Sequence, residues 1–453
     1  MMLKDVLNSI ESNQFLIEIF GLGYVGFPLA IRLAKSGLNV HGIDINTKRL
    51  ERFESENLYE SEVDLKKEFL ECRKNGKLEI SNIPNKTDYV KVGIICVPTP
   101  IPDQNTKSTI YVKSAVENFL SSSKKGDVII LESSIEIGTT EEIKKLIESK
   151  GYEVGKDFGL CFCPERIDPA NKEWGIENIS RVIYCSDDIT YEICKKIYLN
   201  VNGGNLFRVN NSKIAEVVKS FENTFRLVNI SLVNELAILC EKLGINVKEV
   251  INAASTKPFG FLPHYPGAGA GGHCIPKDPR FLLESSKKFG LDFQTIKYAL
   301  KINLEMPSHI CNSIENKMKK LNLERSVIVC GLSYKANVED MRDSASFKII
   351  SELKKRNFNV VGYDPFFNND LIGKYCIENN LRKLNFEVIK NLNDEIIKQF
   401  NCICIVQHHD ISKNRINEIY QNSLLPYIYD CQNKLEFIPS SKSNLESLGS
   451  SQN

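Results

Sequence analysis

The first part of the chain alternates short apolar runs with segments of helical periodicity. Phe15 to Phe20 is an apolar run, followed by the turn GLGYVG and by a helical pattern that stops at Gly37. The next strands are predicted at Val40 to Asp44, Val92 to Val97 and Val128 to Leu131. Such alternation predicts an α/β domain with a doubly wound parallel sheet over residues 1–208.

The middle of the chain is helical. Between Lys213 and Leu243 the apolar residues are spaced by three and four, which predicts one long amphipathic helix. A second helical signal, a Gly/Pro-rich loop from Pro266 to Pro279 and more helix to about residue 320 follow. We therefore expect a central helical domain at 209–322 that connects the two ends of the chain and contains this Gly/Pro-rich loop.

Strand-like runs return in the last part of the chain. They lie at Val327 to Cys330, Val360 to Tyr363, Cys402 to Val406 and Tyr427 to Asp430. Helical patterns separate them, which predicts a second α/β domain at 323–436 without a glycine fingerprint. The Ser- and Asn-rich tail at 437–453 is expected to be disordered. The predicted fold is two Rossmann-like parallel-sheet domains joined by a long helical spine.

Composition excludes several classes of protein. The 58 basic and 57 acidic residues nearly balance, so the chain has no large field to attract nucleic acid or an anionic membrane. Several of the 14 cysteines lie in apolar runs, where a reduced thiol packs as a small hydrophobe. No signal peptide and no membrane-spanning run is recognisable. We expect a cytoplasmic protein.

The turn after the first strand carries a dinucleotide fingerprint. Gly21, Gly23 and Gly26 form G-x-G-x-x-G at a strand-to-helix junction, with Tyr24 and Val25 between them. Glycines at these positions allow the tight turn, the approach of a pyrophosphate and close helix packing. Asp44 ends the next strand, where a carboxylate accepts from ribose hydroxyls. The alternative is a glycine-rich turn beside an unrelated surface aspartate.

The charges near Asp44 bear on the choice of cofactor. A carboxylate there would repel the additional phosphate of NADP, which favours NAD. Lys48 and Arg49 follow closely and weaken that argument. We expect NAD, with Arg49 among the residues that contact it.

One cysteine lies in a loop unlike the others. Cys274 belongs to GAGAGGHCIPKDP and is followed by Lys277 and Asp278. These neighbours favour formation of a thiolate, the nucleophilic form of a thiol. A chemically inert loop cysteine is the alternative, and the local pattern alone does not decide between them.

A polar stripe lies along the long helix. Lys219, Asn223 and Arg226 follow one another at helical spacing. A solvated helix face is the ordinary explanation. An amine and an amide one turn apart would also stabilise a developing oxyanion, provided that Cys274 is close.

Seven segments of the chain resemble one enzyme family. They are GLGYVGFPLA, CVPTP, ESSIEIGTT, CPERIDPANKEW, KSFENTFRLVNISLVNEL, PGAGAGGHCIPKDP and GLSYKANVEDMRDS. In this order they resemble the UDP-glucose/GDP-mannose dehydrogenase family over nearly the whole chain short of the tail.

The resemblance implies a four-electron oxidation with two NAD and a nucleophilic cysteine. Cys274 would capture the aldehyde as a thiohemiacetal that becomes a thioester, which water then hydrolyses. Supporting roles fall on five further residues. Lys219 and Asn223 would stabilise the oxyanion, Asp278 would help to activate water, Glu165 would assist proton transfer, and Ser134, where many relatives have threonine, would keep the hydroxyl that positions water.

The same resemblance implies binding residues and a dimer. The positions matching the family's cofactor contacts are Thr99, Thr140, Lys277 and Arg342. Those matching its UDP-sugar contacts are Arg166, the loop around Phe261, and Lys335, an anchor for the diphosphate or uracil, together with Lys219 and Asn223. The helical spine of the family builds a dimer, which suits the apolar length of the long helix.

Two departures from glucose-specific relatives bear on the substrate. The nucleophile loop reads GGHC with His273 instead of GGSC, and PERIDP replaces PEFL. Both resemble the branch that acts on UDP-N-acetylhexosamines, and the Ala-Asn after PERIDP favours UDP-N-acetylglucosamine. Its uronic acid would supply a surface polysaccharide. UDP-N-acetylmannosamine and UDP-glucose are the enzymatic alternatives. A non-catalytic nucleotide-sugar binding protein would be expected to lack Cys274, Lys219 or Asp278.

Metal binding is not expected. The candidate groups are Cys161 with Cys163, Cys402 with Cys404, and His408 with His409. Alternate cysteines on strands lack the spacing of a zinc knuckle.

Overall fold

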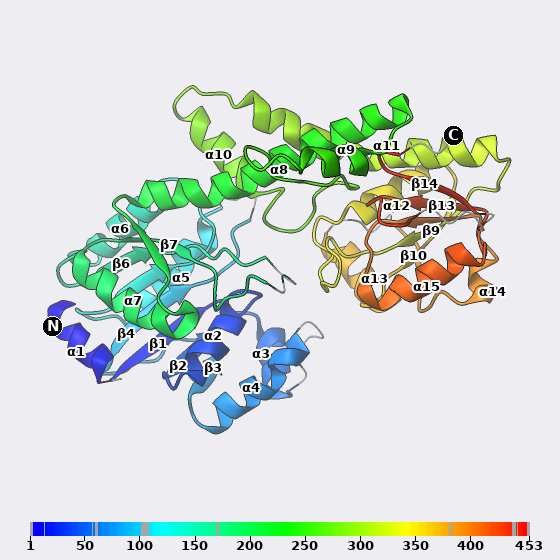
Figure 1. The fold of residues 1–453 in the computed structure, drawn as a ribbon. Helices are drawn as coiled ribbons and strands as arrows, with labels where there is room; N and C mark the ends of the chain where they lie inside the picture. The colour runs from blue at the N-terminus through cyan, green and yellow to red at the C-terminus, as the bar shows by residue number, and fades with distance from the viewer. Residues whose placement is uncertain are drawn as a thin grey trace. The chain divides into compact units, whose positions relative to one another are not determined.

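The protein consists of two compact units, each built around its own sheet (Figure 1). The first unit contains residues 1–222 and 280–291, and the second contains 223–279 and 292–453. This computed structural model describes residues 3–12, 14–56, 58, 62–100, 108–168, 171, 173–379, 381, 384–436, 441 and 443–450. The helices of the predicted central domain belong partly to each unit.

The sheet of the first unit has the order β3-β2-β1-β4-β5-β6-β7-β8 among its described residues. Its strands are β1 (Phe15–Phe20), β2 (Val40–Ile43), β3 (Leu78–Ser81), β4 (Val90–Ile95), β5 (Val128–Leu131), β6 (Gly159–Phe162), β7 (Arg181–Cys185) and β8 (Leu206–Val209). The helices are α1 (Leu3–Glu11), α2 (Gly26–Lys35), α3 (Thr47–Glu54), α4 (Val63–Lys74), α5 (Ile110–Leu120), α6 (Thr139–Ser149) and α7 (Asp188–Asn202). The first six strands have the order of a dinucleotide-binding fold, as predicted.

The central strands are apolar because helices cover both faces of the sheet. Every residue of β4 and of β5 is buried. Continuous apolar runs of this kind are typical of parallel strands between two helical layers. β6 and β7 depart from the expected parallel order, since they pair antiparallel. The connection 163–180 forms no helix in its described residues, so it supplies no crossover of the kind that parallel strands need.

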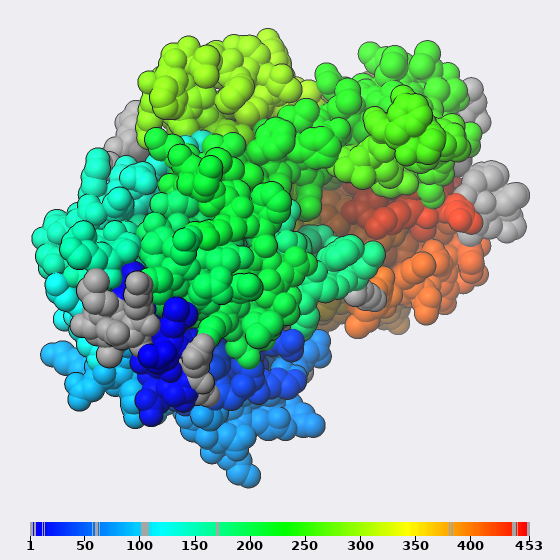
Figure 2. Space-filling view, turned by 60° about the vertical axis from the view of Figure 1, so that its left-hand side comes forward, coloured from blue at the N-terminus to red at the C-terminus, as the bar shows by residue number. Residues whose placement is uncertain are grey.

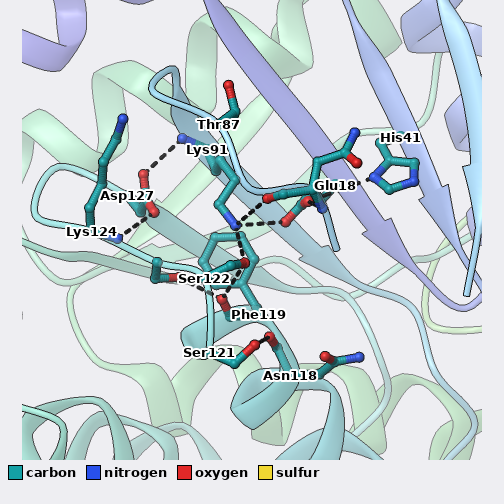
Figure 3. Close-up of polar contacts among 12 residues, drawn as sticks. Glu18, His41, Thr87, Lys91, Asn118, Phe119, Ser121, Ser122, Lys124 and Asp127 are labelled. Carbon is teal, nitrogen blue, oxygen red and sulfur yellow. Dashed lines mark hydrogen bonds and ion pairs between the residues drawn. The ribbon is translucent and has the colours of Figure 1, made fainter. Parts of the chain in front are cut away.

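A buried ion pair lies between two central strands of this largely apolar sheet (Figure 3). Lys91 on β4 directs its ammonium to the carboxylate of Glu18 on β1 at 3.2 Å and to Ser122 Oγ at 2.6 Å. Both charged side chains are essentially inaccessible to solvent. The backbone N–H of Lys91 also donates to Asp127 at 2.8 Å. Burial raises the pKa of Asp127 to about 6, although this backbone bond opposes the increase. Buried charges need such partners to offset their desolvation.

Four helices connect the two sheets along the chain. They are α8 (Ser212–Leu243), α9 (Val247–Ala254), α10 (Asp278–Lys287) and α11 (Gln294–Lys320). The long helix predicted from Lys213 to Leu243 is therefore confirmed. Its apolar stripe does not face a core, because seven of the apolar residues spaced by three and four are exposed. These are Ile214, Val217, Phe221, Phe225, Leu232, Leu239 and Leu243.

The sheet of the second unit is parallel throughout its described strands. Its order is β11-β10-β9-β12-β13-β14, which repeats the order of the first six strands of the other unit. The strands are β9 (Ser326–Cys330), β10 (Asn359–Tyr363), β11 (Glu387–Ile389), β12 (Cys402–Ile405), β13 (Tyr427–Asp430) and β14 (Asn444–Ser447). The helices are α12 (Ala345–Lys355), α13 (Asn369–Glu378), α14 (Asp394–Ile397) and α15 (Asp410–Gln421). The predicted pair of Rossmann-like domains is confirmed.

The expected disorder of the tail is wrong for part of it. Within 437–453, β14 extends the second sheet by pairing with β13, and Gly449 accepts a backbone bond from Val247 at 2.8 Å. Gly449 also donates to Glu241 Oε1 at 3.0 Å. Edge pairing uses backbone groups, so a polar sequence can form this strand without an apolar pattern. Residues 437–440, 442 and 451–453 lie outside the described part.

Membrane insertion finds no support in the helices. None of them, over the described residues, combines the length and apolar character needed to cross a bilayer.

We predict that Gly449→Ala destabilises the second unit. Gly449 has a φ of +75°, and a Cβ there would lie 2.3 Å from Val247 Cγ1. Gly290→Ala is the matched control, since Gly290 has a φ of +69° with no atom within 4 Å of the new Cβ. Backbone strain costs both variants about 1–2 kcal/mol, and overpacking costs Gly449→Ala roughly 1–3 kcal/mol more. Denaturant unfolding measures the difference, and equal losses would contradict the packing described for the tail.

Candidate active site

The loop after β1 holds three glycines in three different environments. Gly21 has a φ of +91°, and a Cβ there would lie 2.9 Å from the carbonyl oxygen of Cys96. A Cβ at Gly26 would lie 2.0 Å from the carbonyl oxygen of Gly21, whereas one at Gly23 would meet no atom within 4 Å. Gly21 and Gly26 therefore allow the tight turn and close helix packing. Gly23 leaves open space near the start of α2, where a turn of this kind accepts a pyrophosphate.

Asp44 lies beside the glycine turn. Its Oδ2 accepts from the backbone N–H of Leu22 at 2.8 Å, and its Oδ1 accepts from that of Asn46 at 2.9 Å. The side chain is half-buried, so the carboxylate is fixed but still partly open to solvent. The structure brings Asp44 and the turn together as predicted, and the contact with ribose stays a prediction. Tyr24 and Val25, also predicted to contact the cofactor, are exposed and half-buried in the same turn.

Arg49 supports the turn from within the protein. Its guanidinium donates to the carbonyl oxygen of Leu22 at 3.1 and 2.9 Å and pairs with Glu62. The same group lies over the ring of Phe53, 4.5 Å from its centroid. Arg49 is buried by these contacts, so they indicate that it holds the turn. Direct contact with the cofactor remains a prediction for this residue.

The predicted cofactor residue Thr140 lies at the start of α6 with a buried carboxylate. Glu216 of α8 accepts from the backbone N–H groups of Gly138 at 2.6 Å and Thr140 at 2.8 Å, and from the Thr140 hydroxyl at 2.6 Å. A carboxylate is favoured there by the positive end of the helix dipole. Thr99 is buried and Ser134 is half-buried on the same unit.

Glu165 and Lys219, both predicted catalytic residues, are neighbours. The Lys219 ammonium donates to the backbone carbonyl of Glu165. Burial raises the pKa of the Glu165 carboxyl, although Lys219 and Arg181 favour its charged form and oppose the increase. A raised pKa makes this carboxyl better able to hold and donate a proton than an exposed glutamate.

Arg166 is held by an ion pair. It donates to both carboxylate oxygens of Glu222, at 3.2 and 2.5 Å, and to the carbonyl oxygen of Ser180 at 2.7 Å. This predicted substrate residue therefore has a fixed orientation in the first unit.

The second unit contains the cysteine loop. Cys274 is exposed, and its carbonyl oxygen accepts from the backbone N–H groups of Lys277 at 3.1 Å and Asp278 at 2.9 Å. These bonds form the turn that leads into α10. The other thirteen cysteines are buried, apart from Cys96, which is half-buried. Exposure therefore distinguishes Cys274 as the thiol that a substrate can reach.

Asp278 is a fully buried carboxylate next to this thiol. Its Oδ2 accepts from Asn223 Nδ2 at 2.6 Å, and its Oδ1 lies 3.7 Å from the ammonium of Lys277. Oδ1 has no hydrogen-bond partner among the described residues. The structure therefore brings together three of the predicted site residues, Asn223, Lys277 and Asp278.

The cysteine loop packs closely on residues 331–344. The backbone N–H of Gly272 donates to the carbonyl oxygen of Arg342 at 2.9 Å. A Cβ at Gly271 would lie 2.6 Å from the carbonyl oxygen of Asp343, and one at Gly272 would lie 2.6 Å from the ring of Tyr334. Glycine is required at both positions, because any side chain would separate the two segments.

His273 and Arg342 lie in this contact region. Burial lowers the pKa of His273 to about 3, with the charges of Lys277 and Arg342 acting in the same direction, so its imidazole is neutral at pH 7. Arg342 pairs with Asp340 at 2.6 Å. Two predicted substrate residues, Lys335 and Phe261, are half-buried and exposed in the same unit.

Several polar contacts in the two units were missed by sequence reasoning. Glu216 caps α6, and Arg181 pairs with Glu132 at 2.8 Å in the core. His409 contacts Asp364 at 3.1 Å. The partners in these pairs lie at least 45 residues apart, and no local pattern links them. The only sequence signal is a charged or polar residue inside or beside an apolar run.

Three buried thiols form a cluster that the sequence also did not indicate. The Sγ atoms of Cys161, Cys185 and Cys194 lie within 4.8 Å of one another. Burial raises the pKa values of Cys161 and Cys194 well above the usual range. Burial also disfavours the Cys185 thiolate, but hydrogen bonds from the other two thiols outweigh it and lower its pKa to about 6. A metal needs several thiolates, which this apolar core disfavours.

Comparison with known proteins identifies all three parts of the chain. Residues 15–202, 213–305 and 328–436 match the NAD binding, central and UDP binding domains of the UDP-glucose/GDP-mannose dehydrogenase family. The predicted NAD cofactor is thereby confirmed. The predicted assignment of the chain as an NAD-dependent nucleotide-sugar dehydrogenase is confirmed as well.

Named relatives cover most of the chain. A UDP-N-acetyl-D-mannosamine dehydrogenase of Methanococcus vannielii is 33% identical over 92% of this chain and 93% of its own. A UDP-N-acetyl-D-glucosamine 6-dehydrogenase of Salmonella typhi is 33% identical over 77% of this chain and 83% of its own. A solved UDP-N-acetylmannosamine dehydrogenase of Pyrococcus horikoshii has a TM-score of 0.82 at 30% identity and covers 96% of this chain and 99% of its own. The chain belongs to the UDP-glucose/GDP-mannose dehydrogenase family.

Proposed function

We propose that this enzyme oxidises the C6 alcohol of a UDP-N-acetylhexosamine to a carboxylate through a thioester on Cys274. The main support for the proposal is the exposed thiol of Cys274, on a loop packed against residues 331–344 and followed by the buried Asp278, whose carboxylate accepts from Asn223. The overall reaction consumes one alcohol, two NAD and one water, and yields one carboxylic acid, two NADH and two protons.

Cys274 takes part in the second half of this reaction. NAD held at the glycine turn would supply the hydride acceptor for both oxidations. Between the two, the Cys274 thiolate adds to the aldehyde carbon and gives a thiohemiacetal. Loss of the second hydride leaves a thioester, and attack by water returns the thiol and releases the acid. A thiol suits this sequence because it is a strong nucleophile and its ester hydrolyses readily.

We assign stabilisation of the oxyanion, activation of water and proton transfer to different residues. Lys219 and Asn223, four residues apart on α8, would donate to the oxyanion of each tetrahedral intermediate. Asp278 would accept a proton from the attacking water through Oδ1, which has no hydrogen-bond partner among the described residues, and Ser134 would help to position that water. Glu165, whose pKa is raised by burial, would carry protons to or from the substrate.

We also assign the residues that would bind NAD and the UDP-sugar. The glycine turn, Asp44 and Thr99 would contact NAD, together with the predicted cofactor residues Tyr24, Val25, Arg49, Thr140, Lys277 and Arg342. The UDP-sugar would contact Lys335, Arg166 and the loop around Phe261, in addition to Lys219 and Asn223. The match of 328–436 to a UDP binding domain supports placing the nucleotide of the substrate on the second unit.

The epimer of the sugar has two candidates. The segment PERIDPAN favours UDP-N-acetylglucosamine, which is our first candidate. UDP-N-acetylmannosamine is the second, and it is favoured by the relatives that carry this name and cover most of the chain. The GGHC and PERIDP segments, which differ from those of glucose-specific relatives, favour a UDP-N-acetylhexosamine over UDP-glucose.

We also propose that the enzyme is a homodimer. The apolar stripe of α8 is exposed, and no other element covers it among the described residues. Green, the colour of the part of the chain that contains α8, marks a broad area of the surface in Figure 2. Large exposed apolar surfaces of this kind mark protein interfaces, and a second copy of the chain offers the same stripe.

Oxidation of a panel of UDP-sugars tests the proposed reaction. We expect UDP-N-acetylglucosamine or its mannosamine epimer to give two NADH per sugar and a product whose mass matches the uronic acid. UDP-glucose should react at least about tenfold more slowly, because the site would lose the contacts of the N-acetyl group. A ratio of one NADH per sugar, or UDP-glucose as the best substrate, would contradict the proposal.

The dimer is tested by Leu232→Glu. Leu232 is 60% exposed on α8, so a charge there should leave the fold intact but prevent burial in an interface. Ile377→Glu is the matched control, because Ile377 is 54% exposed on α13, away from the stripe. Sedimentation should show a dimer for the unchanged enzyme and for Ile377→Glu, and a monomer for Leu232→Glu. A dimeric Leu232→Glu variant would exclude this face.

A further inference from the structure

The second unit repeats the nucleotide-binding turn of the first with altered residues. GLGY after β1 corresponds to GLSY after β9, and Asp44 after β2 corresponds to Asp364 after β10. Gly331 has a φ of +87°, close to the +91° of Gly21. Both sheets also share the same strand order around this point. The correspondence therefore extends from topology to individual residues.

The carboxylates bind the same backbone atom in both turns. Asp364 Oδ2 accepts from the N–H of Leu332 at 2.7 Å, as Asp44 accepts from that of Leu22 at 2.8 Å. The difference lies in what else they bind. Asp364 Oδ2 also accepts from the backbone N–H and the hydroxyl of Ser333, at 3.0 and 3.1 Å. Asp364 is 2% exposed, so its carboxylate serves the turn and is closed to a ribose.

A buried histidine completes this arrangement. His409 Nε2 lies 3.1 Å from Asp364 Oδ2, and its Nδ1 accepts from the backbone N–H of Asn337 at 2.9 Å. Because Nδ1 accepts a bond, the proton of the neutral ring is on Nε2 and is donated to Asp364. His409 is fully buried, and its ring meets that of Phe366 at 5.1 Å in an edge-on contact. It thus links the end of β10 to the loop after β9.

The loop between these anchors carries Lys335. Asp364 holds its start at Leu332 and Ser333, and His409 holds Asn337 at its end. Asn337 has a φ of +61° and exchanges two bonds with Asp410, at 2.9 and 2.8 Å, which fix this unusual conformation. The backbone on both sides of Lys335 is therefore fixed before any ligand binds.

The residue preceding Lys335 is held in the same way. The carbonyl oxygen of Tyr334 accepts from Gln407 Nε2 at 2.9 Å, and its N–H donates to the carbonyl oxygen of Asp340 at 2.9 Å. Gln407 and His409 both follow β12, which pairs with β9. The connection after β12 thus supplies Gln407 and His409, two of the residues that hold the loop.

We propose that Asp364 and His409 are positioning residues that preorganise Lys335 for the diphosphate of the UDP-sugar. The proposal rests on the proposed function of Lys335 as a substrate anchor. A lysine gains affinity from a fixed backbone because less conformational freedom is lost on binding. In the first unit the carboxylate of Asp44 lies at the proposed cofactor surface. In the second unit the carboxylate of Asp364, together with Ser333 and His409, fixes the loop.

Calorimetric titration of the full chain with UDP tests this. His409→Gln loses the nitrogen that accepts from Asn337, and Asp364→Asn loses one of the carboxylate oxygens that accept in the turn. We expect each variant to raise the Kd for UDP about tenfold. The Kd for NAD should stay unchanged. His408→Gln is the matched control, since the adjacent, half-buried His408 makes a similar contact with a carboxylate, that of Asp430, at 2.8 Å. It should bind UDP normally.

A double variant separates positioning from general loss of structure. In the Lys335→Ala background, His409→Gln should weaken UDP binding no further, because the group that it positions is gone. Additive losses, an equal loss for His408→Gln, or parallel loss of NAD binding would overturn the inference. If Lys335→Ala itself leaves the Kd for UDP unchanged, the substrate assignment of Lys335 fails and this inference fails with it. If only His409→Gln and Asp364→Asn lack effect, the inference alone fails.

Discussion

Both halves of this enzyme are organised by the same interaction. Backbone N–H groups of a loop donate hydrogen bonds to a carboxylate at the end of the neighbouring strand. In each half the chain turns sharply after the first strand through a glycine with positive φ, and the next N–H meets an aspartate. The turn and the carboxylate fix each other, so the carboxyl edge of each sheet presents a defined backbone. NAD binding in the first unit and the proposed UDP contact in the second both depend on that edge.

The cysteine loop depends on a second constraint, which is close backbone packing. Gly271 and Gly272 allow the loop to contact residues 331–344 within the second unit. The turn that follows leaves Cys274 exposed while Asp278 is buried. The strand cysteines have the opposite environment. Burial raises the pKa of Cys330 and Cys402 beyond the usual range, which disfavours their reactive thiolates.

Local patterns in the sequence predicted much of the fold. Apolar runs located the principal strands to within about two residues, and spacing located α8, because burial between helical layers and helical periodicity both act over short distances. The same pattern did not show that the α8 stripe is exposed, since periodicity reveals an apolar face but not its partner. The polar strand β14 was missed because edge pairing depends on backbone bonds. Glycine and cysteine motifs indicated the site, whereas Glu216, Asp364 and His409 act through partners far away in sequence.

In the proposed mechanism, the thiol at position 274 carries the sugar during the second oxidation. The most direct test of this step is product release by Cys274→Ser with UDP-N-acetylhexosamine and NAD, followed by mass spectrometry. We expect at least about 10³-fold slower release of the uronic acid, because a serine ester would form and hydrolyse poorly here. Cys376→Ala, which removes a buried thiol of α13, should release it normally. Release of the acid by Cys274→Ser at the normal rate would show that the reaction does not pass through a thioester at this position.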